Sequence, residues 1–332
     1  MDPAIPDSAV SSATPQAVAE QRLEHLPVVI FTVVMGIAGF SLVWLKAHPI
    51  LGMPVFVGEG LLGLASALYG LLLALYGLKA VRYPQAVKLE IRHPIRISFF
   101  PMISISLLLL ALGYLQSAPV MAYGLWIIGA LVHLCLTVAI FGSWLHHAHY
   151  AIQHANPVWF TTVVGNIVIS IVGVRLGLPE LSWFFFSIGI VFWILLLAII
   201  LYRLIFHEPL PARLTPTLFI LLAPPSVGFI AYTQLIGELD AFARVLYYTA
   251  LFMAVLLASN TLRFLRIPFF ISAWACSFPL TAFTLATLTM SAYLPGFTVL
   301  AGGLLIFLTL LITALTVRTL VAVWRRQICL PE

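Results

Sequence analysis

Apolar residues form long continuous runs along the chain, and charged residues are confined to the short stretches between these runs. No Asp, Glu, Lys or Arg occurs between Arg96 and Arg175, or between Arg266 and Arg318. Each window holds two runs of about 20 residues, the length of helix that crosses the hydrocarbon core of a bilayer. Because the runs do not alternate as β-barrel strands do, the pattern predicts an all-α polytopic membrane protein.

We expect ten transmembrane helices. Their predicted bounds are Leu26–Trp44, Phe56–Leu78, Pro94–Leu115, Ala118–Leu145, Pro157–Val174, Leu181–Ile205, Leu214–Ile236, Ala241–Leu262, Ile267–Tyr293 and Pro295–Trp324. The odd-numbered spans begin at intervals of 68, 63, 57 and 53 residues, so the chain reads as five helical hairpins of the same orientation. Residues 26–325 are expected to form one channel domain, between a disordered tail over 1–25 and a short tail over 326–332.

Helix-breaking residues fall inside the odd-numbered spans. They are Gly36, Gly39, Pro101, Gly165, Pro224, Pro225 and Pro279. In the even-numbered spans proline occurs only in the first turn, at Pro119 and Pro295. Proline frees a backbone carbonyl and bends a helix, and freed polar groups are tolerated in a membrane where they line water. The pattern favours five kinked inner helices around a central pore, although kinks in a packed bundle would give the same breaks.

The positions of the basic residues predict the orientation. With both termini inside, 13 of the 16 Lys and Arg residues lie in cytoplasmic segments and three lie outside, at Lys46, Arg175 and Arg244. The positive-inside rule therefore predicts that both termini are cytoplasmic. The membrane is expected to be the bacterial inner (plasma) membrane. Hydrophobic residues make up 62% of the chain and the net charge is +5, carried at span ends, so we expect contact with lipid and not with nucleic acid.

Ionisable residues within the spans are few. No carboxylate lies deep in an odd-numbered span, which argues against a proton-coupled carrier and against a cation channel. Glu59 is expected at the membrane surface, and His133 is expected to hydrogen-bond a neighbouring helix. Arg175 and Arg244 can snorkel to the surface, or raise the anion concentration at a pore mouth.

The chain carries no motif of an enzyme, a cofactor site or a metal site. The cluster His146, His147, His149 and His154 is interpreted as a solvated segment, with metal binding or pH sensing as alternatives. Phe278 precedes Pro279 on an inner span. A large aromatic residue at that point can close a narrow pore by dewetting it, or can simply pack in the core.

Four segments carry a family resemblance. They are His93–Phe100, Asn156–Phe160 with Gly165 and Asn166, Leu222–Gly228, and Trp274–Pro279. In this order they resemble the tellurite-resistance/dicarboxylate transporter family, which includes TehA-like proteins, the plant slow-type anion channel and fungal malate and sulfite exporters.

The resemblance implies five inner helices around a pore in each subunit of a homotrimer, with a ninth-helix phenylalanine as the gate. Carried over, the gate is Phe278. The pore-lining or kink positions are Thr32, Gly36, Pro101, Gly165, Asn166, Pro224, Pro225, Ser226, Ser277 and Pro279. Relatives carry a proline in the first inner helix, whereas this chain has Phe31–Gly36 there, so the kink is expected at Gly36.

We therefore expect a gated, passive channel for small inorganic anions such as chloride and nitrate. The rival hypothesis is a secondary carrier that exports C4-dicarboxylate, sulfite or tellurite. A third is a membrane-embedded sensor or metal-binding protein built on the histidine cluster.

Overall fold

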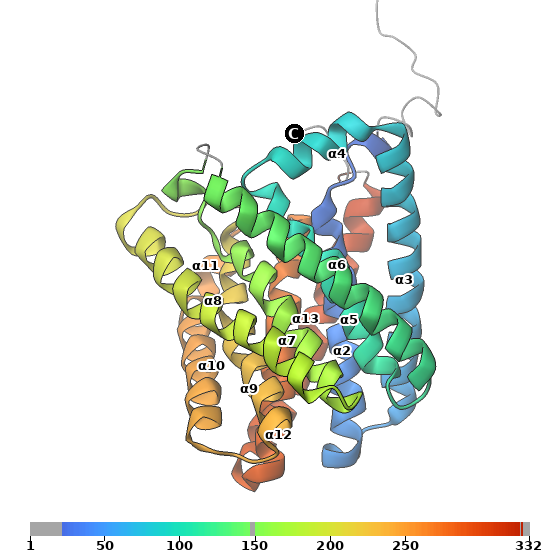
Figure 1. Ribbon diagram of the computed structural model, residues 1–332, viewed down its shortest axis with the longest axis vertical. Coiled ribbons are helices and arrows are strands. Elements are labelled where there is room, and N and C mark those ends of the chain that lie inside the picture. Colours follow the sequence, from blue (N-terminus) through green and yellow to red (C-terminus); the bar gives the residue numbers. More distant parts are fainter. Residues whose placement is uncertain (1–21, 147–149, 326, 328–332) are drawn as a thin grey trace, which may run out of the picture.

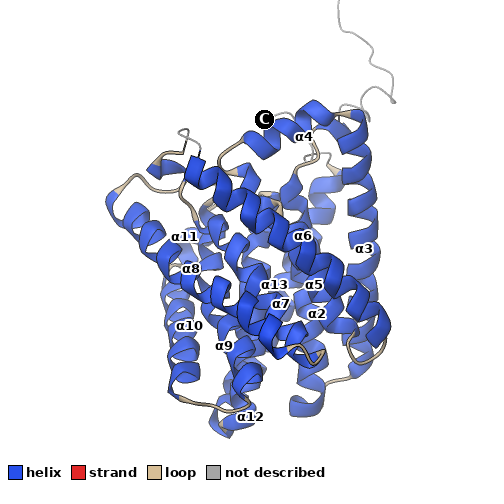
Figure 2. Ribbon diagram, in the orientation of Figure 1, coloured by secondary structure: helices blue, strands red, loops and turns tan. Residues whose placement is uncertain are grey.

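The computed structural model describes residues 22–146, 150–325 and 327, and helices are the regular elements of this part of the chain (Figures 1 and 2). Ten helical spans within it are long and apolar enough to cross a membrane. They run Val28–Leu51, Val55–Arg82, Arg96–Tyr114, Pro119–His146, Pro157–Arg175, Pro179–Phe206, Thr215–Ile236, Ala241–Ser259, Ile271–Tyr293 and Pro295–Trp324. The prediction of a ten-helix membrane protein is confirmed, with most bounds within a few residues.

Burial divides the spans into two sets. Within an apolar 18-residue stretch of each span, buried residues make up 61–94% in the odd-numbered spans but only 17–39% in the even-numbered spans. The odd-numbered spans contain α2 (Phe31–Leu51), α5 (Pro101–Tyr114), α7 (Thr161–Arg175), α9 (Ala223–Ile236) and α12 (Ser277–Tyr293). The even-numbered spans contain α3 (Val55–Arg82), α6 (Pro119–His146), α8 (Pro179–Phe206), α10 (Ala241–Ser259) and α13 (Thr298–Trp324). The inner helices are therefore shielded by outer helices whose apolar surface is left for lipid.

The five inner helices close into a ring. Each packs against the next in chain order, from α2 to α5, α7, α9 and α12, and α12 packs back against α2. Each inner helix also packs against the outer helix that follows it in the chain. A closed ring of this kind leaves an axis along which side chains from all five helices meet.

Every inner span begins with a 3₁₀ segment and continues as an α-helix. These segments are η1 (Val28–Ile30), η2 (Arg96–Phe99), η4 (Pro157–Phe160), η5 (Thr215–Leu222) and η6 (Ile271–Cys276). Pro101, Pro224, Pro225 and Pro279 all lie within the first three residues of the α-helix that follows. A proline in a first turn lacks only an N–H group that an α-helix would not use there.

The breaks in two inner spans lie elsewhere than the sequence indicated. In the first span the 3₁₀ segment changes to α-helix between Ile30 and Phe31, ahead of Gly36. In the fifth span the change comes between Phe160 and Thr161, ahead of Gly165. Both glycines therefore lie inside regular α-helix. Their role is to leave room for side chains of neighbouring helices.

A buried ion pair ties an outer hairpin to the start of the ring. The Nζ of Lys79, at the end of α3, donates to the Oε1 of Glu90 and to the Leu26 carbonyl, each at 2.8 Å. Glu90 belongs to α4 (Pro84–Arg92), the short helix at the upper end of Figure 1, and its Oε2 accepts from the Tyr76 hydroxyl. Leu26 comes just before η1, so the pair fixes α4 against the start of the first inner span.

Three expected features fall wholly or partly outside the described residues. The predicted N-terminal tail over 1–25 is described only from residue 22, and residues 22–24 are helical. Of the predicted C-terminal tail over 326–332, only residue 327 is described. His147 and His149 of the histidine cluster also lie outside the described part.

Replacing Glu90 with Gln should destabilise the protein. The substitution leaves the Lys79 ammonium buried without a counter-charge, a loss on the order of 3–5 kcal/mol. Thermal unfolding in detergent measures it, with the exposed Glu238→Gln as a control of equal charge change. Equal melting temperatures for the two variants would show that the pair carries no stability.

Candidate pore and gate

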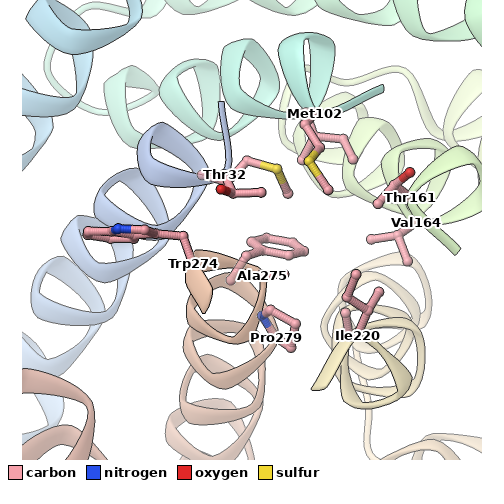
Figure 3. Close-up of a pocket in the computed structure, with 12 residues that line it drawn as sticks. Thr32, Met102, Thr161, Val164, Ile220, Trp274, Ala275 and Pro279 are labelled. Atoms are coloured by element: carbon pink, nitrogen blue, oxygen red, sulfur yellow. The ribbon is translucent and has the colours of Figure 1, made fainter. Parts of the chain in front are cut away.

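A narrow cavity lies on the axis at the level where the 3₁₀ segments become α-helices. Its volume is about 20 Å³, close to the space that one water molecule needs. Every inner span supplies part of its wall, including Thr32, Met102, Thr161, Ile220 and Ala275, whose side chains surround a common space in Figure 3. No charged residue lies among the wall residues described.

A much larger cavity, the vestibule, occupies the other half of the ring. Its volume is about 610 Å³. On α2 the wall changes from Met35 at the narrow cavity to Gly39 and Lys46 at the vestibule, and on α7 from Val164 to Val168 and Arg175. The two cavities therefore follow one another along the same helices.

Phe278 lines both cavities and lies at the boundary between them. It is the second residue of α12, between Ser277 and Pro279, and its side chain is buried. Within the described part of the chain its ring makes no aromatic pair, whereas Phe283 on the same helix stacks on Tyr247 at 6.3 Å. The Phe278 ring thus lies between the two cavities, without an aromatic contact of the kind that Phe283 makes.

The charge along this path is of one sign. Among the described wall residues of the vestibule, Lys46 and Arg175 are positive and none is an Asp or Glu. The Nε of Arg175 donates to the Gln234 Oε1 at 3.0 Å. A wall with cations and without carboxylates favours an anion over a cation.

The predicted site residues separate into two groups. Thr32 and Pro279 line the narrow cavity, as does Phe278. The remaining positions line neither cavity and instead take part in helix starts or helix contacts. These are Gly36, Pro101, Gly165, Asn166, Pro224, Pro225, Ser226 and Ser277.

Gly36 allows α12 to approach α2. A Cβ at Gly36 would overlap the Ser277 side chain, and one at Gly39 would overlap the Thr281 hydroxyl. The Ser277 hydroxyl turns back to the Trp274 carbonyl at 2.6 Å, so it adds no outward polar group at this contact. The close contact fixes the first turn of α12, and with it the position of Phe278.

Gly165 accommodates the imidazole of His133, which a Cβ would overlap. His133 shares a hydrogen bond with the Ser104 Oγ at 2.8 Å and contacts the Thr162 carbonyl at 3.2 Å. The expectation that His133 hydrogen-bonds neighbouring helices is confirmed, and it links α6 to both α5 and α7. The Asn166 amide donates to the same Thr162 carbonyl at 2.9 Å. Asn166 therefore hydrogen-bonds within α7 and does not line either cavity.

Sequence reasoning missed several wall residues. Met102 is, like Thr32 and Phe278, the second residue of an α-helix that follows a 3₁₀ segment. If the changes from 3₁₀ to α-helix had been predicted at the correct residues, this shared position would have identified Met102 as a wall residue. Lys46 was recognised only as an external charge, because nothing in its local sequence shows that it faces the axis.

Replacing Gly36 with Ala should destabilise the protein by about 1–3 kcal/mol, the usual cost of overpacking. The added methyl group meets Ser277 and Trp274, so α2 and α12 must move apart. Thermal unfolding measures the loss against Gly63→Ala, whose new methyl group meets open space. If both variants melt at the same temperature, the close contact does not determine the helix spacing.

Comparison with known proteins places these features in a family. The family model described as SLAC1, voltage-dependent anion channel, matches residues 25–320. The S-type anion channel SLAH3 of Arabidopsis thaliana is 32% identical over 273 residues, which cover 80% of this chain and 43% of that protein. The guard cell S-type anion channel SLAC1 of the same plant is 26% identical over 328 residues, covering 93% of this chain and 58% of the relative.

A bacterial relative is also similar. The tellurite resistance protein TehA homolog of Haemophilus influenzae is 25% identical over 224 residues, which cover 67% of this chain and 68% of the relative. The chain spans about half the length of the plant relatives. The resemblance inferred from the sequence motifs is confirmed, and the match over residues 25–320 shows that this chain belongs to the SLAC1 family of voltage-dependent anion channels.

Proposed function

We propose that the protein is a gated, passive channel that conducts small monovalent anions such as chloride and nitrate through the axis of its helix ring. The proposal rests on the two adjoining cavities inside the helix ring. A narrow cavity and a vestibule meet at one phenylalanine, and their described walls hold two cations and no carboxylate. Relatives named as S-type anion channels support the same class of function.

Phe278 is the proposed gate. The narrow cavity beside it has room for about one water molecule, so a hydrated ion cannot pass while the ring lies across the axis. The neighbouring wall is apolar, with Met35, Met102 and Ile105, and such a constriction excludes ions by dewetting. Opening requires the ring to leave the axis.

The narrow cavity favours weak binding, which suits a channel. Its described wall has no fixed charge and few polar atoms, so an ion there is neither strongly held nor coupled to a proton. A carrier of C4-dicarboxylate, sulfite or tellurite would need a binding site that alternates between the two sides. The TehA homolog is named for tellurite resistance, but no described residue of this path favours that function.

Orientation and assembly belong to the same proposal. Of the 16 Lys and Arg residues, 13 lie on the side where the inner spans begin, which supports cytoplasmic termini and a vestibule open to the outside of the inner membrane. We propose a homotrimer with one pore per subunit, embedded in lipid, on the strength of the family resemblance alone.

Phe278→Ala should raise the conductance by about tenfold or more, since removing a barrier of only about 1.4 kcal/mol gives that factor. The measurement is single-channel recording in planar bilayers with chloride and then nitrate. Phe252→Ala on α10 is the matched control, because it removes an exposed ring from an outer helix. An unchanged conductance in folded Phe278→Ala protein would exclude Phe278 as the gate.

A further inference from the structure

The vestibule wall brings together two cations from different inner helices. Lys46 comes from the last turns of α2, and Arg175 is the last residue of α7. Both side chains line the same cavity, so the two positive charges face one enclosed space. They are separated in sequence by more than a hundred residues, and the closure of the helix ring places them on one surface.

Neither cation has a counter-charge within the described part of the chain. Lys46 makes no hydrogen bond or ion pair to any described residue, and Arg175 donates to the neutral side-chain amide of Gln234. No Asp or Glu lies among the described wall residues of the vestibule. Two like charges without a carboxylate favour an anion from solution, which relieves their repulsion.

We propose that Lys46 and Arg175 form an anion-binding site in the vestibule, where a small hydrated monovalent anion is held before it reaches Phe278. Gln234 acts as a positioning residue, because its amide oxygen holds the Arg175 guanidinium. The volume of about 610 Å³ leaves room for the hydration shell of the ion, so binding is weak and the ion leaves easily.

The site makes the path electrically asymmetric. The vestibule carries the cations, whereas the described wall of the narrow cavity carries no charge. Anions are therefore concentrated on the vestibule side only. At low salt, the anion current that a voltage drives from that side should exceed the current that an equal and opposite voltage drives from the other side. Screening removes the difference, because the Debye length falls from about 30 Å at 0.01 M salt to about 3 Å at 1 M.

Anion binding at Lys46 and Arg175 can be tested independently of any current measurement. Crystals of the full protein grown in bromide salts should show an anomalous peak between Lys46 and Arg175. The peak should weaken in Lys46→Gln and disappear in Lys46→Gln combined with Arg175→Gln. It should persist in Arg244→Gln, which removes an exposed cation of α10 that lies outside the vestibule wall. A peak that survives in the double variant, or no peak in the wild type, would overturn the site.

The consequence for current rests on the proposed function. In a Phe278→Ala background, removing either vestibule cation should lower the flux from the vestibule side by about two- to threefold at 0.01 M salt. The loss should vanish near 1 M salt, and Arg244→Gln should show none of it. A loss that is independent of salt would indicate a structural effect and contradict the site.

The two proposals fail in different ways. A bromide peak without current in any variant would reject the channel and leave the binding site in place. Normal anion current without a bromide peak would reject the binding site and leave the channel in place.

Discussion

Backbone hydrogen bonding in hydrocarbon is the constraint on which this structure depends. A pore wall in a membrane cannot be made from loops, because each unpaired N–H or C=O group facing lipid costs several kcal/mol. The five inner spans meet this requirement by remaining helical and changing helix type, from 3₁₀ to α, at the level of the narrow cavity. Pro101, Pro225 and Pro279 lie where this change comes at little cost in hydrogen bonds. The outer helices then isolate the ring from lipid.

Phe278, the proposed gate, derives its position from contacts between helices. Gly36 brings α12 against α2, and the second residue of α12 is the phenylalanine that separates the two cavities. His133 joins α5, α6 and α7 behind the wall, through hydrogen bonds that stay away from the axis. The path itself is left with an apolar constriction on one side and two cations on the other. This division of polar groups, with the neutral ones behind the wall and the charged ones in the vestibule, is what suits the ring to weakly held anions.

The sequence predicted the spans and their alternation well, because long apolar runs and buried Pro and Gly residues are strong local signals. It placed two breaks wrongly, at Gly36 and Gly165, because a glycine that allows a close contact gives the same signal as one that bends a helix. The contact depends on Ser277 or His133, which are distant in sequence. Lys46 could not be assigned to the axis either, since a cation near a span end most often snorkels to the surface. Thr32, Phe278 and Pro279 line the narrow cavity, and the sequence pointed to them because they lie next to a helix break or within a family motif.

The central claim is that ions crossing this ring are anions moving down their electrochemical gradient. The most direct test is the reversal potential of the current through purified protein in a planar bilayer with a potassium chloride gradient. For a passive anion channel, the current should reverse close to the chloride equilibrium potential, and a superimposed pH gradient should leave the reversal potential unchanged. A reversal near the potassium equilibrium potential would contradict it. So would the absence of current together with saturable, proton-linked uptake of a dicarboxylate.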